Sequence, residues 1–515
     1  GGGGAVLTSL GVDETVVWTK VQWRLLPLFF AMIVLCYVDR TNLAFAAIQL
    51  NEDLQFTPSV FGLGSGLFFL SYASLQIPSN LLLRHARANV YLSAIILAWG
   101  AVACLFAFMS TPAQFYALRL LLGAAESGAF PGMWFTLSRW LPPDRLTMAF
   151  TITDSGITLS NVFAAPVAAA CLSMSGAAGL RGWQWLFLLE GAPTVLLALA
   201  VLRLLPAQPE EATFLGPWER TWLSLRVSGA HGARRGLGTP SAASGGPHPA
   251  GSADTDAEPL LQKHVPGTGA AARLGTSPSS SVWSDVRATL SNRFVWYLGA
   301  VKFVRDIAGF GVIYWTPSVV HSILNGTTLN VDGTDYAGSG EHSGRDNAGV
   351  AAVLLTAVPF TIAAVWNVGV AHRSQLLNEK VMHIAAPCVV MGVAYALFPW
   401  AVSRSALGGL ACLTCGVVGV YTGSGTTTAL LRELAVASGA SFAVAGPLYN
   451  GIGNVGGFIG PFMVGALVQQ LNSFTVPSII MAACLVMGGL MVGALPLLLD
   501  LPSGVRVGLL TPRPT

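Results

Sequence analysis

Two pairs of opposite charges interrupt apolar stretches of this sequence. Arg119 and Glu126 lie in one apolar segment, and Asp39 and Arg40 are neighbours in another. The spacing of Arg119 and Glu126 is two helical turns, which places both side chains on one helix face, roughly 10 Å apart along the axis. An ionisable side chain at membrane depth costs about 2.5–3.5 kcal/mol and usually faces a bundle interior or a watery pathway. These residues therefore predict a charged site, with a salt bridge that only joins helices as the alternative.

The two charged pairs can balance each other across helices. Neighbours on a helix point about 100° apart, so Asp39 and Arg40 cannot pair with each other. The simplest arrangement pairs Asp39 with Arg119 and Arg40 with Glu126. An entering carboxylate then leaves surplus negative charge, which protonation of Asp39 or Glu126 removes. The residues thus predict coupling of a small organic anion to H⁺, with no further cofactor.

The composition predicts an all-α membrane protein. The chain has 515 residues, of which 53% are hydrophobic and 10% charged, and its mean hydropathy is +0.62; soluble proteins carry about 25% charged residues. A net charge of +3 gives no indication of nucleic-acid binding. The apolar segments show no metal-ligand cluster and no nucleophile with a base, which argues against an enzyme.

Twelve apolar segments have the length of a membrane span. They cover residues 25–48, 60–82, 90–109, 115–137, 148–172, 185–204, 294–320, 349–370, 384–402, 407–430, 442–467 and 477–499. We expect two six-helix bundles, at 24–205 and 293–500, joined by a connector at 206–292. The connector is rich in Gly, Ser, Ala, Pro and charge, and this composition predicts disorder. The remaining residues, 1–23 and 501–515, form terminal tails.

Basic residues predict the orientation of the chain. The connections on the side opposite the N-terminus hold only Arg181, Arg345 and Arg404, and the other basic residues outside the apolar segments lie on the N-terminal side. Both termini and the connector are therefore expected in the cytosol. The sequon at Asn325 then lies outside and is a glycosylation candidate. We expect a monomer in the plasma membrane, with an organelle membrane as the alternative.

A faint repeat relates the two bundles. Asp154-Ser155-Gly156 precedes Pro166 in the fifth segment, as Tyr449-Asn450-Gly451 precedes Pro461 in the eleventh. A duplication of six helices puts the binding site at the interface between the halves, near the midplane. Chance similarity between glycine-rich helices is the alternative.

Four stretches carry a family resemblance. They are Tyr37-Val38-Asp39-Arg40-Thr41-Asn42, Phe68-Phe69-Leu70-Ser71-Tyr72 through Asn80, Phe115 through Gly132, and Gly182-Trp183-Gln184-Trp185-Leu186-Phe187 through Gly191. With them the chain resembles the major facilitator superfamily, and within it the anion:cation symporter family of allantoate, tartrate, hydroxyphenylacetate and sugar-acid permeases.

The resemblance implies proton-coupled symport of an organic anion by alternating access. The family's acids at the positions of Asp39 and Glu126 are implicated in proton coupling, and its first-helix arginine, here Arg40, in gripping the substrate carboxylate. A Na⁺-driven or potential-driven carrier of organic anions or phosphate is one alternative. A nutrient sensor that signals through the connector is another.

Further polar and aromatic residues are candidates for the lining of the site. The lining prediction covers Tyr37, Tyr72, Trp315, Asn450 and Asn454, and packing is the alternative for each. Asp154 and Arg305 are possible additional charges: a third acid, and a positive group for a second carboxylate. We expect Lys302 and Asp306, one turn apart, to neutralise each other.

Overall fold

The computed structural model describes residues 13–83, 86–141, 143–235, 280–324, 342–377 and 379–500. The side chain of Asp154 and the sequon residue Asn325 lie outside the described part, and so do residues 236–279. All regular elements within these ranges are helices, in agreement with the expected all-α class.

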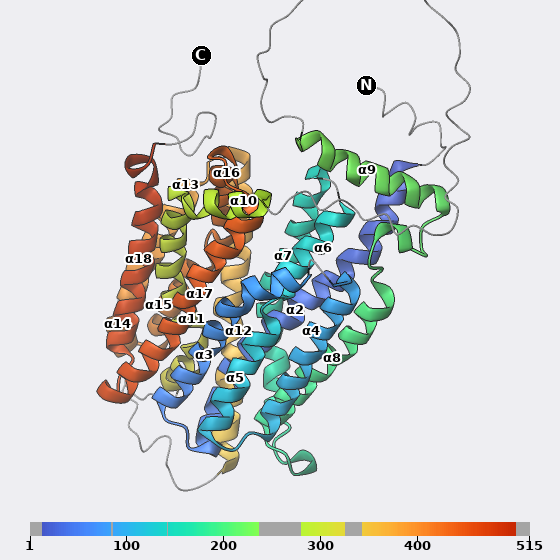
Figure 1. The fold of residues 1–515 in the computed structure, drawn as a ribbon. Coiled ribbons are helices and arrows are strands. Elements are labelled where there is room, and N and C mark those ends of the chain that lie inside the picture. The colour runs from blue at the N-terminus through green and yellow to red at the C-terminus, as the bar shows by residue number, and fades with distance from the viewer. Residues whose placement is uncertain are drawn as a thin grey trace, which may run out of the picture.

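The helices form two halves (Figure 1). The N-terminal half consists of α2 (Glu14–Leu54), α3 (Pro58–Leu83), α4 (Ala88–Leu105) with η1 (Phe106–Phe108), α5 (Pro112–Glu126), α6 (Ala129–Trp140), α7 (Pro143–Leu172), η2 (Ala177–Gly179) and α8 (Gly182–Leu204). The C-terminal half consists of α11 (Arg293–Leu324), α12 (His342–Leu377), α13 (Val381–Ala396), α14 (Phe398–Arg404), α15 (Ala406–Tyr421), α16 (Ser424–Ala437), α17 (Phe442–Leu471) and α18 (Thr475–Leu498). Helix α9 (Pro217–Arg235) lies where α2 begins, at the top of Figure 1. We call this the α9 end, and the opposite end, where α2 stops and α3 begins, the far end.

The described helices reproduce the expected spans, and the fourth is divided between two short helices. Ten are long and apolar enough to cross a membrane, or eleven when α13 and α14, bent by 46°, count as one span. The remaining expected span, 115–137, is divided into α5 and α6 at Ser127 and Gly128. Pro131 has no N–H to donate to the carbonyl four residues earlier, at Ser127, which explains the break.

The connector departs from the expected disorder at both of its ends. It contains η3 (Pro209–Glu211), α9, and α10 (Ser280–Leu290). Trp222 of α9 is buried against Trp18, with ring centroids 5.3 Å apart, and Lys20 Nζ lies 2.7 Å from a Glu219 carboxylate oxygen. The prediction of disorder was wrong here because an average over 87 residues hides a short amphipathic segment. Helix α9 is thereby attached to the first helix of the N-terminal half.

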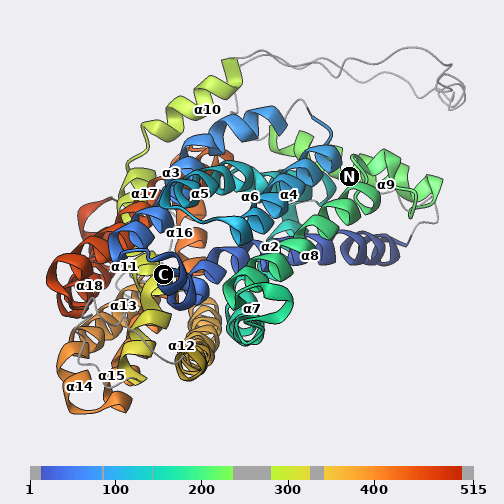
Figure 2. The ribbon, with the colours of Figure 1, turned by 90° about the horizontal axis from the view of Figure 1, so that it is seen from below.

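The two halves pack closely towards the far end. Helix α3 runs along α17, and α7 along α12 (Figure 2). A Cβ placed on Gly62 of α3 would lie 2.6 Å from the Pro461 carbonyl oxygen of α17, so the two backbones are in direct contact. Ser59 N donates to Gln469 Oε1 at 3.1 Å across the same junction. This arrangement closes the far end between α3 and α17.

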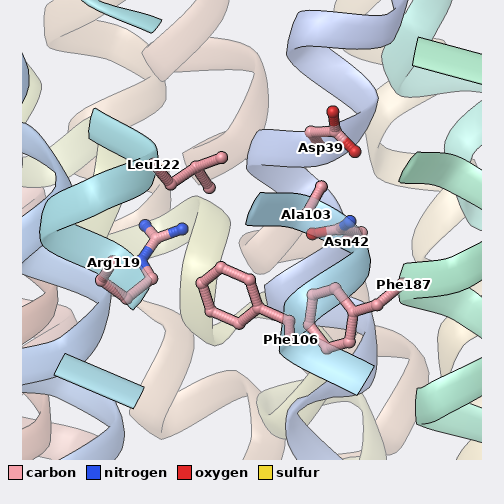
Figure 3. A pocket seen from close by; sticks show the side chains of 7 residues that line it. All are labelled: Asp39, Asn42, Ala103, Phe106, Arg119, Leu122 and Phe187. Carbon is pink, nitrogen blue, oxygen red and sulfur yellow. The ribbon is translucent and has the colours of Figure 1, made fainter. Parts of the chain in front are cut away.

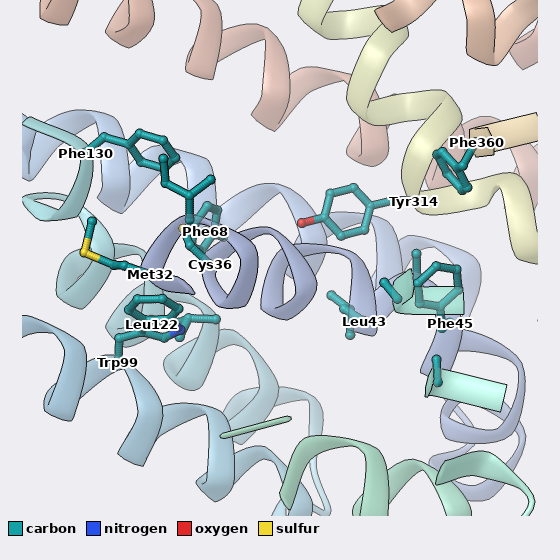
Figure 4. Close-up of a cluster of buried hydrophobic side chains, with 14 of the residues drawn as sticks. Met32, Cys36, Leu43, Phe45, Phe68, Trp99, Leu122, Phe130, Tyr314 and Phe360 are labelled. Atoms are coloured by element: carbon teal, nitrogen blue, oxygen red, sulfur yellow. The ribbon is translucent and has the colours of Figure 1, made fainter. Parts of the chain in front are cut away.

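Apolar side chains surround the middle of α2, where the charged residues lie. One continuous buried cluster extends from the N-terminal half into the C-terminal half, and a second lies within the C-terminal half alone. In Figure 4, side chains of α2 lie among those of neighbouring helices, and Tyr314 and Phe360 extend from the other half. The buried charges are therefore enclosed by hydrocarbon, and their partners must come from the protein.

Candidate functional site

The four charged residues predicted from the sequence are all buried. Their exposed fractions are 2% for Asp39, 7% for Arg40, 1% for Arg119 and 0% for Glu126. Asp39 and Arg40 lie on α2, and Arg119 and Glu126 on α5. None of them faces lipid, because each side chain is covered by other parts of the protein. The burial of a charge requires compensation by partners, and these partners determine what the site can do.

Arg40 and Glu126 form an ion pair, which is the second pairing expected from the sequence. Arg40 Nε donates to Glu126 Oε2 at 3.0 Å, and Arg40 Nη2 lies 3.0 Å from the same oxygen. The Cys36 thiol also donates to Oε2, at 3.4 Å. Glu126 Oε1 and Arg40 Nη2 have no hydrogen-bond partner. Both contacts of Arg40 thus go to Oε2, and the other carboxylate oxygen of Glu126 stays unpartnered.

Four aromatic rings surround the Arg40 guanidinium. Its central carbon lies 4.8–5.6 Å from the ring centroids of Tyr37, Phe68, Tyr72 and Phe130. Cation–π contacts of this kind stabilise a desolvated guanidinium by about 2 kcal/mol. Tyr37 and Tyr72, predicted as lining residues, thus contact the cation itself.

Arg119 does not pair with Asp39, and the first pairing expected from the sequence is wrong. Its Nε donates to the Gly64 carbonyl at 3.1 Å, and its Nη2 donates to the Ser65 carbonyl and to Tyr314 Oη, both at 3.0 Å. All three partners are neutral. No salt bridge of Arg119 occurs within the part of the chain that the structure describes. Arg119 thus carries a buried positive charge without a carboxylate, and it joins the N-terminal half to Tyr314 of the C-terminal half.

Asp39 is held by a different helix. Its Oδ2 accepts a hydrogen bond from the Trp99 indole of α4, and its Oδ1 has no hydrogen-bond partner. Arg119 lies across a small cavity from Asp39 (Figure 3) and is engaged by two carbonyls of α3 and Tyr314, which is the physical reason for the failed pairing. Spacing on α2 and α5 alone could not reveal the Trp99 donor, because it comes from a third helix.

Asp39 and Arg119 nevertheless line one small cavity (Figure 3). It is surrounded by Asp39, Asn42, Ala103, Phe106, Arg119, Leu122 and Phe187. Arg119 lies on one side, and Asp39 and Asn42 lie on the other. All of these residues belong to the N-terminal half. The cavity therefore differs from the expected site between the halves, although Arg119 reaches the interface through Tyr314.

The other residues predicted to line the site, Asn450, Asn454 and Trp315, belong to the C-terminal half. Asn450 is half-buried on α17, and Asn454 on the same helix is buried with Nδ2 unpartnered. The Trp315 indole donates to the Pro461 carbonyl at 3.3 Å, and its ring packs on Phe61 across the two halves. In this conformation Trp315 therefore packs between helices and does not line the cavity.

The charges of the C-terminal half are engaged in local structure. Lys302 Nζ and Asp306 Oδ2 are 2.6 Å apart, as expected from their spacing. Arg305 donates to the Val420 and Thr422 carbonyls at the C-terminal end of α15. A cation is stabilised at that end of a helix, so Arg305 fixes the break between α15 and α16.

Two further buried polar residues were not predicted from the sequence. Gln76 of α3 and Glu190 of α8 are 2% and 4% exposed, and neither side chain has a hydrogen-bond partner at its terminal polar atoms. Gln76 lies well inside the expected span 60–82, whereas Glu190 is the sixth residue of the expected span 185–204. A polar residue within an apolar segment is the signal that could have indicated both.

A bundle of apolar helices in two halves, with charges buried in the first half, defines a multi-pass membrane protein built around an internal polar site. The sequence profile of the Major Facilitator Superfamily matches residues 29–461. The chain therefore belongs to this superfamily and is a transporter, not an enzyme.

Similar proteins support this assignment. The chain is 30% identical to a putative tartrate transporter of Agrobacterium vitis over 465 residues, which cover 90% of each chain. It is 28% identical to the putative metabolite transport protein NicT of Pseudomonas putida, over 93% of this chain and 94% of that one. Among solved structures, the xylose transporter of E. coli matches with a TM-score of 0.60 at 11% identity, over 91% of this chain and 97% of that one. A bacterial homologue of the human lysosomal transporter Spinster gives 0.58 at 14% identity, over 94% of each chain.

Proposed function

We propose that this transporter moves a small organic anion, a mono- or dicarboxylate, together with protons by alternating access. The observation that carries the proposal is Arg119: a buried guanidinium that lines the cavity and has only neutral partners. A substrate carboxylate is the missing counter-ion, and the planar guanidinium can bind a carboxylate with two hydrogen bonds. The name of the Agrobacterium vitis relative, a putative tartrate transporter, is consistent with such a substrate.

Proton coupling follows from the charge balance of the site. Asp39 and Glu126 supply two negative charges, and Arg40 and Arg119 two positive ones. An anion bound at Arg119 makes the enclosed site negative, and one carboxyl must then take up H⁺ to restore neutrality. Asp39 has an unpartnered oxygen beside the cavity and Glu126 has one beside Arg40, so both carboxyls can accept the proton. H⁺ is the coupling ion, and no other cofactor is needed.

The remaining features of the proposal concern orientation. We assign the α9 end to the cytosol, because most basic residues between the helices lie there. Both termini would then be cytosolic, and the far end would face outside in the plasma membrane. The chain acts as a monomer in this scheme, and Asn325 stays a predicted glycosylation site. Substrate enters from the far end and leaves at the α9 end.

The test is transport by the purified protein in liposomes that enclose a pH-sensitive dye. L-Tartrate and L-lactate serve as dicarboxylate and monocarboxylate probes. We expect acidification of the interior on addition of an accepted anion, and loss of at least about 90% of uptake in Arg119→Gln, since a buried hydrogen-bonded charge contact is worth more than 1.4 kcal/mol. The matched control is Arg404→Gln, which removes an exposed arginine at the far end.

Three results would oppose the proposal. Uptake at a rate that does not depend on the pH gradient would refute proton coupling. Uptake that stops when choline replaces Na⁺ identifies a sodium-driven carrier instead. Full activity of Arg119→Gln, with the same elution profile in size-exclusion chromatography as the unmodified protein, removes the assigned anion site.

A further inference from the structure

Glu190 is an acidic residue that the proposed mechanism does not yet use. It lies within α8 and is 4% exposed, and neither of its carboxylate oxygens has a hydrogen-bond partner. None of the salt bridges among the described residues includes it. An ionised carboxylate without partners is among the most costly groups to bury, and such a group normally binds a proton and becomes neutral.

The groups that face Glu190 come from each helix packed against α8. From α2 come Asp39 and the Asn42 amide, both close enough to act on the Glu190 carboxyl electrostatically. From α4, Cys104 contacts the adjoining Gly191, and from α7, Cys171 lies within electrostatic reach. None of these groups is a cation. The acidic group that acts on Glu190 is thus a second carboxyl, that of Asp39.

Two carboxylates that interact in a buried site cannot both be ionised without a large cost. The surrounding donors decide which one carries the charge. The Trp99 indole donates to Asp39 Oδ2 and favours its ionised form, whereas Glu190 faces only the Asn42 amide and both of its oxygens stay unsatisfied. The proton therefore resides on Glu190 in this conformation.

Asp39 connects this pair to the cavity. Asp39 and Asn42 line it, and so does Phe187, which lies one turn before Glu190 on α8. Glu190 is not among the lining residues of the cavity. A proton that enters the cavity meets Asp39 first and passes from there to Glu190.

We infer that Asp39 and Glu190 form a proton-binding pair that is separate from the Arg40–Glu126 ion pair, and that Glu190 carries a second proton in each transport cycle. The inference rests on the proposed function. With all five ionisable groups charged, the site carries one excess negative charge and repels an anion. Protonation of Glu190 makes it neutral, and protonation of Asp39 as well leaves one positive charge for the substrate carboxylate. Both carboxyls lose their protons at the α9 end after the anion has left.

The transport test compares calibrated acidification with uptake of radiolabelled L-lactate, which carries one carboxylate. We expect about two protons per lactate for the unmodified protein and about one for Glu190→Gln, whose amide keeps the shape but cannot titrate. Glu190→Asp keeps a carboxyl and should restore a ratio near that of the unmodified protein. The matched control is Glu379→Gln, which changes a buried glutamate of the C-terminal half that contacts His383 and should leave the ratio unchanged.

A second measurement needs no substrate. Infrared spectra of the purified protein, recorded across a pH titration, report the C=O stretch of protonated carboxyl groups. We expect a titrating carboxyl band that is lost in Glu190→Gln and kept in Glu379→Gln. Equal bands and equal proton ratios in Glu190→Gln and the unmodified protein would overturn the inference and leave the proposed function intact. Absence of proton movement in the unmodified protein defeats the proposed function, while the infrared titration still reports on Glu190.

Discussion

The hydrogen bond between Arg119 and Tyr314 offers a direct test of how the two halves are held together. Arg119 Nη2 donates to Tyr314 Oη at 3.0 Å, and this bond crosses from α5 to α11. Tyr314→Phe removes only the hydroxyl and leaves the bonds of Arg119 to two backbone carbonyls. A hydrogen bond to a charged group is worth about 1.5–3 kcal/mol. The bond can exist only while the halves are close, so its loss destabilises the conformation with the far end closed.

The free-energy change converts into a shift in conformational populations. A loss of about 1.5–3 kcal/mol lowers the ratio of far-end-closed to far-end-open molecules by on the order of 10- to 100-fold. Spin labels on cysteines introduced at Gln55 and Asn472 measure this ratio as a distance distribution. Both positions are exposed at the far end, one in each half. Native cysteines that react with the label are first replaced by alanine.

The control is a tyrosine whose hydrogen bond stays within one half. Tyr91 Oη donates to the Ser79 carbonyl at 2.7 Å, and both residues belong to the N-terminal half. Tyr91→Phe should therefore leave the distance distribution unchanged. An unchanged distribution in Tyr314→Phe, or an equal change in both variants, refutes the assignment of Arg119 and Tyr314 as a contact that favours far-end closure.

Three further outcomes follow from the geometry. Arg40→Lys replaces a guanidinium that contacts four rings with a compact ammonium, and we expect uptake in liposomes to fall at least tenfold, since the lost contacts are worth about 2 kcal/mol; undiminished uptake contradicts this role. Gly62→Ala inserts a Cβ 2.6 Å from a carbonyl oxygen of α17. It should destabilise the far-end-closed form relative to the open form by about 1–3 kcal/mol, which the same spin-label distances measure. A shift toward the closed form contradicts the packing. Burial raises the pKa of Glu219, but hydrogen bonds from Lys20 and a backbone N–H outweigh it, and the pKa is lowered overall. The stability from Glu219 is thus complete above its unfolded-state pKa of about 4.3 and is lost as the pH falls through the lower folded-state pKa; the melting temperatures of the unmodified protein and Glu219→Gln should converge on acidification, and a constant difference opposes the reasoning.

The spans and the charged residues could be predicted from the sequence because apolar length and charge at membrane depth are local properties. The pairing of Arg40 with Glu126 also followed, since neighbours on α2 cannot satisfy each other. The partners of Arg119 could not be predicted from the sequence. They are backbone carbonyls of α3 and a tyrosine of the other half, and no spacing rule identifies a carbonyl as a partner.

Helix α9 and the buried Glu190 were also not predicted from the sequence, for different physical reasons. Helix α9 was missed because composition was averaged over the whole connector, although Trp222 and Leu223 form a local apolar face that is fully buried. Glu190 lies within a family motif near the expected start of its span, so its position in the sequence did not indicate burial beside a charged site. Its role depends on Asp39, and only the structure brings the two helices together.

The two halves contribute differently to the proposed mechanism. Three acids and two arginines are buried in the N-terminal half, whereas in the C-terminal half Arg305 binds a helix end and Lys302 is neutralised by Asp306. Charge recognition thus belongs to the first half. The second half contributes neutral groups such as Tyr314, which binds the same Arg119 Nη2 that a substrate carboxylate would use. Anion and tyrosine compete for one donor, so opening of the far end frees Arg119 at the moment when an anion can enter. An anion that satisfies Arg119 removes the need for the tyrosine contact, and closure must then depend on the backbone contact of α3 with α17.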